Sequence, residues 1–190
     1  MLAISYASDG LAAVEHAQLA LRMTTAPARV LAMASKQLAY GFALAGQPDS
    51  SRFALDDTAA FLTQARQEAP EAHGPGQNSV DDPDLLAIFT ATCDVYLGAG
   101  ERVVTALEPR MTSIGTGSQR TSAITAAKLA QAYAQAGDPT RSCDLILATL
   151  DTAATVDSLT TRSELLRVVP TLDRWPGRED VREVRHRLGR

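Results

Sequence analysis

An aromatic residue followed four positions later by glycine, at the end of an alanine-rich stretch, occurs four times in this chain of 190 residues. Recurrence at about 34 to 37 residues is typical of helix–turn–helix solenoid repeats. The copies are Tyr6–Gly10, Phe42–Gly46, Tyr96–Gly100 and Tyr133–Gly137, spaced 36, 54 and 37 residues apart. The pattern predicts an all-α fold: a right-handed solenoid of about four antiparallel helical hairpins with C-terminal capping helices.

The composition agrees with tightly packed helices. Hydrophobic residues make up 45% of the chain, but aromatic residues only 5%, so alanine supplies much of the apolar surface. Alanine is the best helix former and lets helices approach closely. The length fits one domain or one short repeat array, and we expect a single repeat domain over residues 1–190.

Two copies of the repeat align without a gap. Residues 37–48 match residues 128–139, so that Phe42 meets Tyr133 and Pro48 meets Pro139. Glycine ends the first helix of each hairpin because it adopts the left-handed C-terminal cap without strain. In the second of these copies, we expect Asp138 to cap a helix that begins at Pro139. The second helices are predicted at roughly 11–23, 50–68, 101–112 and 139–155.

The third copy and the segment before it depart from the regular period. Residues 70–84 contain three prolines and two glycines and hardly any large apolar side chain. They predict a flexible insertion between hairpins, although a lid or a partner-recognition loop is a second interpretation. The turn after Gly100 is about two residues short, and Pro109 should kink or shorten the helix that follows.

The spacing and the matched positions resemble the tetratricopeptide repeat over roughly residues 1–155. These positions are Leu38, Ala39, Phe42 and Gly46, and Leu129, Ala130, Tyr133 and Gly137. The place of the consensus tryptophan is taken by Ser35, Phe89 and Ala126, so the copies are degenerate.

Residues 158–190 predict a C-terminal cap, and their pattern resembles the closing helices of a particular group. That group is the actinobacterial helix-turn-helix transcriptional regulators, whose C-terminal halves are degenerate tetratricopeptide arrays. The residues that carry the likeness are Ser158, Arg162, Leu166, Leu172, Trp175, Val181, Val184 and Leu188. The resemblance implies a sensor or dimerisation half attached to a DNA reader. Because the first hairpin begins almost at residue 1, we expect a fragment of a longer protein whose DNA-binding part is missing.

A ligand or partner of such an array would contact the concave face, which the first helices line. Counting back from the glycines, the positions predicted to look outward there are Lys36, Tyr40, Asp94, Leu97, Lys128 and Gln131. Their mixture of charge, amide and ring suits a peptide or a small polar ligand. The lysine and asparagine clamp of the best-known peptide-binding members is largely missing. A plain solvated helix face is the alternative interpretation.

No catalytic, metal or cofactor site is predicted. His16, His73 and His186 have no converging acid or cysteine, and Cys93 and Cys143 fit best as small buried residues. The segment of residues 113–121 has two glycines, but it lacks the lysine and the glycine spacing of a nucleotide-binding loop. The arginine-rich end of the chain is either a phosphate-contacting helix or, as we favour, a capping helix with a solvated outer face.

Charge and hydropathy limit the partners. The net charge of −4 argues against nucleic-acid contact by this segment, and no apolar run is long enough for a membrane span. We expect a cytoplasmic, non-enzymatic protein, either the ligand-sensing or oligomerisation domain of a transcriptional regulator or a free-standing adaptor that joins proteins. Its expected partners are a protein or peptide, a small-molecule effector, and a second copy in a homodimer.

Overall fold

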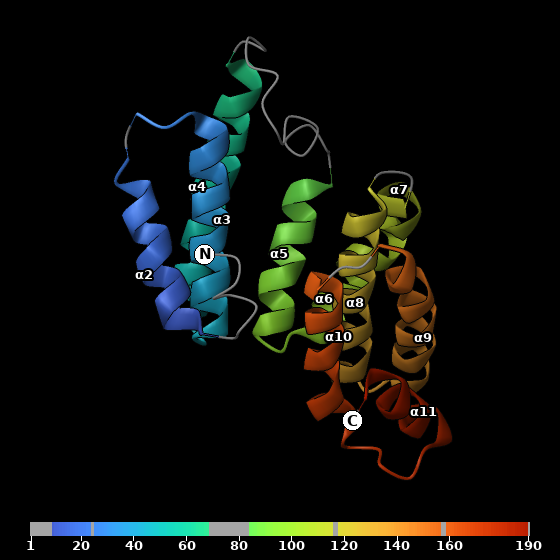
Figure 1. The fold of residues 1–190 in the computed structure, drawn as a ribbon. Coiled ribbons are helices and arrows are strands. Elements are labelled where there is room, and N and C mark those ends of the chain that lie inside the picture. The colour runs from blue at the N-terminus through green and yellow to red at the C-terminus, as the bar shows by residue number, and fades with distance from the viewer. Residues whose placement is uncertain (1–8, 24, 69–83, 116–117, 157–158, 190) are drawn as a thin grey trace. The chain divides into compact units, whose positions relative to one another are not determined.

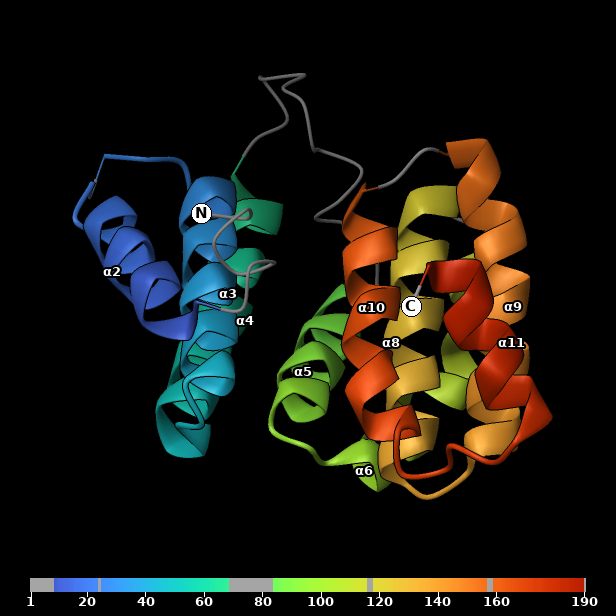
Figure 2. The same cartoon turned by 60° about the horizontal axis from the view of Figure 1, so that its bottom comes forward.

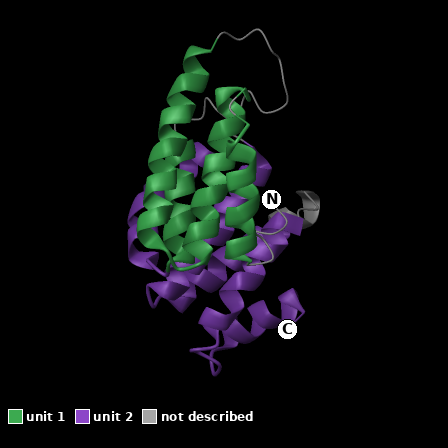
Figure 3. Cartoon of the chain, turned by 90° about the vertical axis from the view of Figure 1, so that its left-hand side faces the viewer, with its two compact units in different colours: residues 1–97 green, residues 98–190 purple. Residues whose placement is uncertain are grey.

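The computed structural model describes residues 9–23, 25–68, 84–115, 118–156 and 159–189, and every regular element in these ranges is a helix (Figure 1). The predicted all-α class is therefore confirmed. The chain divides into two compact units, residues 1–97 and residues 98–190 (Figure 3). The right-handed solenoid of hairpins remains a prediction.

The first unit is built around helix α3, which contacts the other three helices of the unit. Its helices are α2 (Gly10–Leu21), α3 (Ala28–Leu44), α4 (Pro48–Gln67) and α5 (Leu85–Tyr96). Its core combines small alanines with a few large side chains: Ala32, Ala39, Tyr40, Ala43, Ala54, Leu55, Leu62, Leu85, Phe89 and Cys93. The alanines let helix backbones lie close together, as the composition indicates.

The second unit is built around α8, with α9 and α10 on either side of it (Figure 2). The elements are α6 (Gly100–Leu107), a 3₁₀ turn (Glu108–Arg110), α7 (Met111–Gly115), α8 (Gln119–Gln135), α9 (Pro139–Val156), α10 (Leu159–Leu172) and α11 (Glu179–Leu188). Helix α6 contacts α8, and α11 lies on α9. The break at the 3₁₀ turn contains Pro109, which confirms the predicted shortening of this helix.

The hairpins α3–α4 and α8–α9 turn in the same way. Gly46 and Gly137 have φ angles of 71° and 86°, in the left-handed region that glycine adopts without strain. The next N–H in each turn donates back across it to the carbonyl of Phe42 or Tyr133, at 2.9 Å in both cases. This is the hydrogen bond of a Schellman cap.

A second pair of contacts confirms that these two hairpins are equivalent. The Ser51 hydroxyl donates to the Ala39 carbonyl at 3.0 Å, and the Ser142 hydroxyl donates to the Ala130 carbonyl at 2.7 Å. Each serine lies five positions after its turn glycine, and each carbonyl seven positions before it. As predicted, α9 begins at Pro139.

The third copy of the pattern turns at a different glycine from the one that the sequence predicts. The turn between α5 and α6 is made by Gly98, with a φ of 79°, and not by Gly100. The residue four positions before the turn is therefore Asp94 and not Tyr96, and the predicted alignment of this copy is wrong by two residues. Gly100 is the first residue of α6, which explains why its turn looked two residues short.

Gly100 has a structural counterpart in Gly10 rather than in the turn glycines. Each is buried and begins a helix that packs against the next long helix of its unit. A Cβ at Gly10 would come within 2.7 Å of the backbone of α3, and one at Gly100 would clash with the Ala132 carbonyl in α8. The aromatic–glycine pattern thus mixes two kinds of glycine, one for turning and one for close helix contact.

The ends of the predicted pattern are only partly described. Tyr6 and residues 70–83 of the expected insertion lie outside the described residues. The predicted cap over residues 158–190 contains α10 and α11. Its Val181, Val184 and Leu188 side chains are buried in the core of the second unit, and Trp175 packs against that core, as expected.

Candidate interaction surface

The residues predicted for the concave face of the first unit take part in its packing. The Tyr40 side chain is buried and meets the rings of Phe89 and Tyr96 edge-on, with centroids 6.2 and 6.0 Å away. The half-buried Lys36 places its ammonium 5.1 Å from the Phe89 centroid and 5.5 Å from that of Tyr40. These distances are in the range of cation–π attraction. Asp94 and Leu97 are half-buried, the former in α5 and the latter just after it.

The residues predicted in the second unit are buried. Lys128 is buried in α8, where its ammonium lies 3.1 Å from the carboxylate of Glu164 in α10. Arg167 is within 3.9 Å of the same carboxylate. Gln131 is also buried, and its side-chain oxygen has no hydrogen-bond partner among the described residues. A buried ion pair joins α8 to α10 here, where the sequence indicated a polar ligand face.

The prediction that these positions look outward is therefore wrong for Tyr40, Lys128 and Gln131. Helices that pack against α3 and α8 cover the faces that carry them: α5 in the first unit and α10 in the second. The structure brings Lys36 and Tyr40 together. It pairs Lys128 with Glu164, which is not among the predicted positions. Partner binding by the six residues stays a prediction.

A more open surface lies where α11 meets α9. Helix α11 is well specified locally, because acids occupy its first turn, bases its last turn, and Gly189 with a φ of 75° caps its end. Two arginines tie it to α9 near its two ends. Arg178 donates to the Thr140 hydroxyl at 2.8 Å, and Arg187 donates to Asp151 at 2.6 Å.

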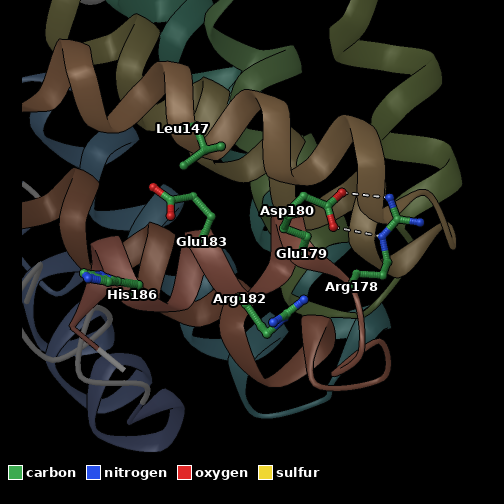
Figure 4. Close-up of a pocket in the computed structure, with 7 residues that line it drawn as sticks. All are labelled: Leu147, Arg178, Glu179, Asp180, Arg182, Glu183 and His186. Carbon is green, nitrogen blue, oxygen red and sulfur yellow. Dashed lines mark hydrogen bonds and ion pairs between the residues drawn. The ribbon is translucent and has the colours of Figure 1, made fainter.

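Arg178 has a second partner inside the cap. It donates two hydrogen bonds to the carboxylate of Asp180, at 3.0 and 2.7 Å (Figure 4). These bonds hold the pKa of Asp180 below its ordinary value, so that the carboxylate stays charged. Arg185 is paired as well, with Asp173 at 2.9 Å. Three of the arginines at this end of the chain therefore have carboxylate partners within the fold.

The polar side chains that lie along α11 between Arg178 and Arg187 differ from these paired arginines. Glu179, Arg182, Glu183 and His186 are all exposed, and in the described part of the chain none of these side chains makes a hydrogen bond or an ion pair. Together with Leu147 of α9 and the Arg178–Asp180 pair, they line an open groove of about 880 Å³ (Figure 4). We call these four residues the α11 stripe.

The lining of the groove combines apolar and charged groups. Its floor is the half-buried Leu147 and the aliphatic stems of the long side chains, and its rim carries both signs of charge. Among the described residues no three His, Cys, Asp or Glu side chains come together as metal ligands. Both cysteines are buried, as expected, and burial raises the pKa of Cys143 to about 11.

Comparison with protein-family models, curated proteins and solved structures finds no match to this chain. The class that the structure defines is an all-helical protein whose units contain helical hairpins. In the described ranges no helix combines the length and the apolar character that crossing a bilayer requires.

The sequence contains a signal for this face of α11. The members of the α11 stripe follow the i, i+3, i+4, i+7 spacing of one helix face, so their common face could be read from the sequence. The sequence predicts a solvated outer face for the arginines of this helix, and Arg182 is indeed exposed. What the sequence could not show is that Leu147 of α9 lines the same groove.

Proposed function

We propose that this chain is a non-enzymatic oligomerisation domain of a transcriptional regulator. The observation that supports oligomerisation most directly is the α11 stripe, which leaves three charged side chains and the His186 imidazole unpaired beside an apolar floor while neighbouring arginines are paired. An open groove with a mixed-charge rim suits a protein surface better than a small molecule, which binds in enclosed, mostly apolar pockets.

The regulatory half of the proposal rests on different support. The all-helical units contain two equivalent hairpins closed by glycine caps, and a two-helix cap follows them. This arrangement is compatible with the resemblance of residues 158–188 to the closing helices of regulators. A transcriptional regulator also needs a DNA-binding domain, which is encoded in the same reading frame or in a partner gene. If neither encodes one, the regulator assignment is wrong and the adaptor function takes its place.

Sedimentation velocity over a wide range of protein concentration tests the oligomerisation function. We expect the sedimentation coefficient of the chain to rise with concentration toward that of a dimer. Native mass spectrometry of protein purified from its own host then shows whether a peptide or small effector is also bound. A chain that stays monomeric at every concentration would contradict the oligomerisation function.

A further inference from the structure

The α11 stripe has an order of charges that matters for its partner. Along the helix it reads acid, base, acid, base, from Glu179 through Arg182 and Glu183 to His186. All four line the same groove, and their spacing puts them on one side of the helix. A partner that satisfies them must offer basic side chains to Glu179 and Glu183, and carboxylates to Arg182 and His186, at the same spacing.

The same helix running in the opposite direction meets that requirement. A twofold axis that runs beside α11, perpendicular to it and level with the midpoint between Arg182 and Glu183, places Arg182 opposite Glu183 of the second copy. The same axis places Glu179 opposite His186 of the second copy. Each pair occurs twice, because an isologous interface uses the same patch on both chains. This one twofold rotation therefore gives each of the four side chains of the α11 stripe a partner on the second copy.

The surroundings favour this partner over a polyanion. Glu179 and Glu183 lie on the same rim as Arg182, so a row of phosphates would meet two carboxylates in the groove. The arginines that could offset them are engaged: Arg178 with Asp180, and Arg187 with Asp151. The floor at Leu147 gives a second helix an apolar contact beside the ion pairs.

We propose that the groove between α9 and α11 binds α11 of a second copy of this chain, antiparallel about a twofold axis between Arg182 and Glu183. This inference rests on the proposed oligomerisation function and names its interface. Because the pairs are exposed and each contributes little, the dimer is weak and its dissociation constant rises with salt concentration.

Charge reversal at the centre of the stripe tests the pairing. Arg182→Glu places like charges opposite each other twice in every dimer, and so does Glu183→Arg. Each single variant should raise the dissociation constant about tenfold or more. The double variant Arg182→Glu/Glu183→Arg restores opposite charges across the axis and should regain the dissociation constant of the unmodified chain. Asp57→Arg, a charge reversal on the exposed face of α4, should leave it unchanged.

Mixing the two single variants gives the sharpest readout. In a heterodimer, the glutamates at 182 and 183 of one chain face the arginines at 182 and 183 of the other. Native mass spectrometry separates the three dimers by mass, and we expect the heterodimer to exceed either homodimer by far. Neither substitution touches the buried Val181, Val184 or Leu188, and circular dichroism checks that the variants stay helical.

The outcomes separate this inference from the function on which it rests. A dimer that neither single variant weakens overturns the α11 interface and leaves oligomerisation standing. Single variants that weaken the dimer without recovery in the double variant or in the mixture also overturn the pairing. A monomeric unmodified chain overturns both proposals.

Discussion

Gly10 and Gly100 act through the space they leave rather than through their backbone angles. A Cβ on Gly10 would lie 2.7 Å from the Gly41 carbonyl oxygen and the Ala45 nitrogen, and one on Gly100 would lie 2.6 Å from the Gln135 Cβ. Contacts under 3.0 Å are essentially never made by real Cβ atoms, so helices must shift to admit one. Because neither position carries a side chain, α2 can lie this close to α3 and α6 can lie this close to α8.

Gly100→Ala should therefore destabilise the protein. We expect the free energy of unfolding to fall by about 1–3 kcal/mol, the usual cost of forcing an extra group into a packed contact. Urea unfolding followed by circular dichroism measures it. Gly115→Ala is the matched control, because nothing lies near that position, and it should be neutral or slightly stabilising. Equal effects at the two positions would contradict the close-contact role.

The buried thiol of Cys143 predicts that the stability of the protein depends on pH above pH 9. Burial, more than the nearby Asp180, raises the pKa of its thiol from the ordinary 9.0 to about 11. Since the folded state favours the thiol, the stability it contributes is complete below pH 9 and is lost as the pH rises toward about 11. In a Cys93→Ala background, thiolate absorbance should titrate with a midpoint near pH 11. A midpoint at or below the ordinary value would show that the thiol is accessible to water.

At the scale of elements, the contact between α8 and α10 depends on a charged pair in the interior. The Lys128 and Glu164 side chains are 4% and 0% exposed, and 3.1 Å separates their charged groups. Removing two charges from water costs several kcal/mol each, which their attraction roughly offsets. The pair is therefore a weak source of net stability, but either member alone would be expensive to bury.

Lys128→Met should destabilise the protein by about 3 kcal/mol, because it leaves the fully buried Glu164 carboxylate with only the more distant Arg167, at 3.9 Å, as a counter-charge. The double variant Lys128→Met/Glu164→Leu should recover most of that loss. A double-mutant cycle of unfolding free energies measures the coupling. Additive effects of the two substitutions would show that the charges do not depend on each other.

The hairpins were predictable because their signals are local. A glycine cap, a following proline and a capping aspartate fall within a few residues, as at Gly137, Asp138 and Pro139. The third hairpin was misaligned because Gly98 and Gly100 lie two residues apart and the sequence does not say which one turns the chain. The burial of Lys128 could not be predicted, since its cause is Glu164 in a helix two elements further along.

At the scale of the molecule, each compact unit has a hydrophobic core of its own. In the second unit that core draws on four helices, α8 to α11, with the fully buried Leu165, Leu172 and Leu188 among its largest side chains. A core that lies inside one unit does not need the other unit to exclude water.

Residues 98–190 should therefore fold without the first unit. We expect a helical circular dichroism spectrum and a cooperative thermal transition. A shorter chain, residues 98–156, lacks the core side chains of α10 and α11 and should lose the cooperative transition. An unfolded 98–190 fragment would show that the two units depend on each other to fold.

The interior ion pair has a consequence for how this sequence can change over generations. A substitution at position 164 alone leaves Lys128 buried without a carboxylate, and one at position 128 alone leaves Glu164 with only Arg167 as a counter-charge. A joint replacement of Lys128 and Glu164 by apolar residues of similar volume removes both fully buried charges. The two positions should therefore covary in related chains, each lineage keeping both charges or neither. Intermediates with a single charge should be rare.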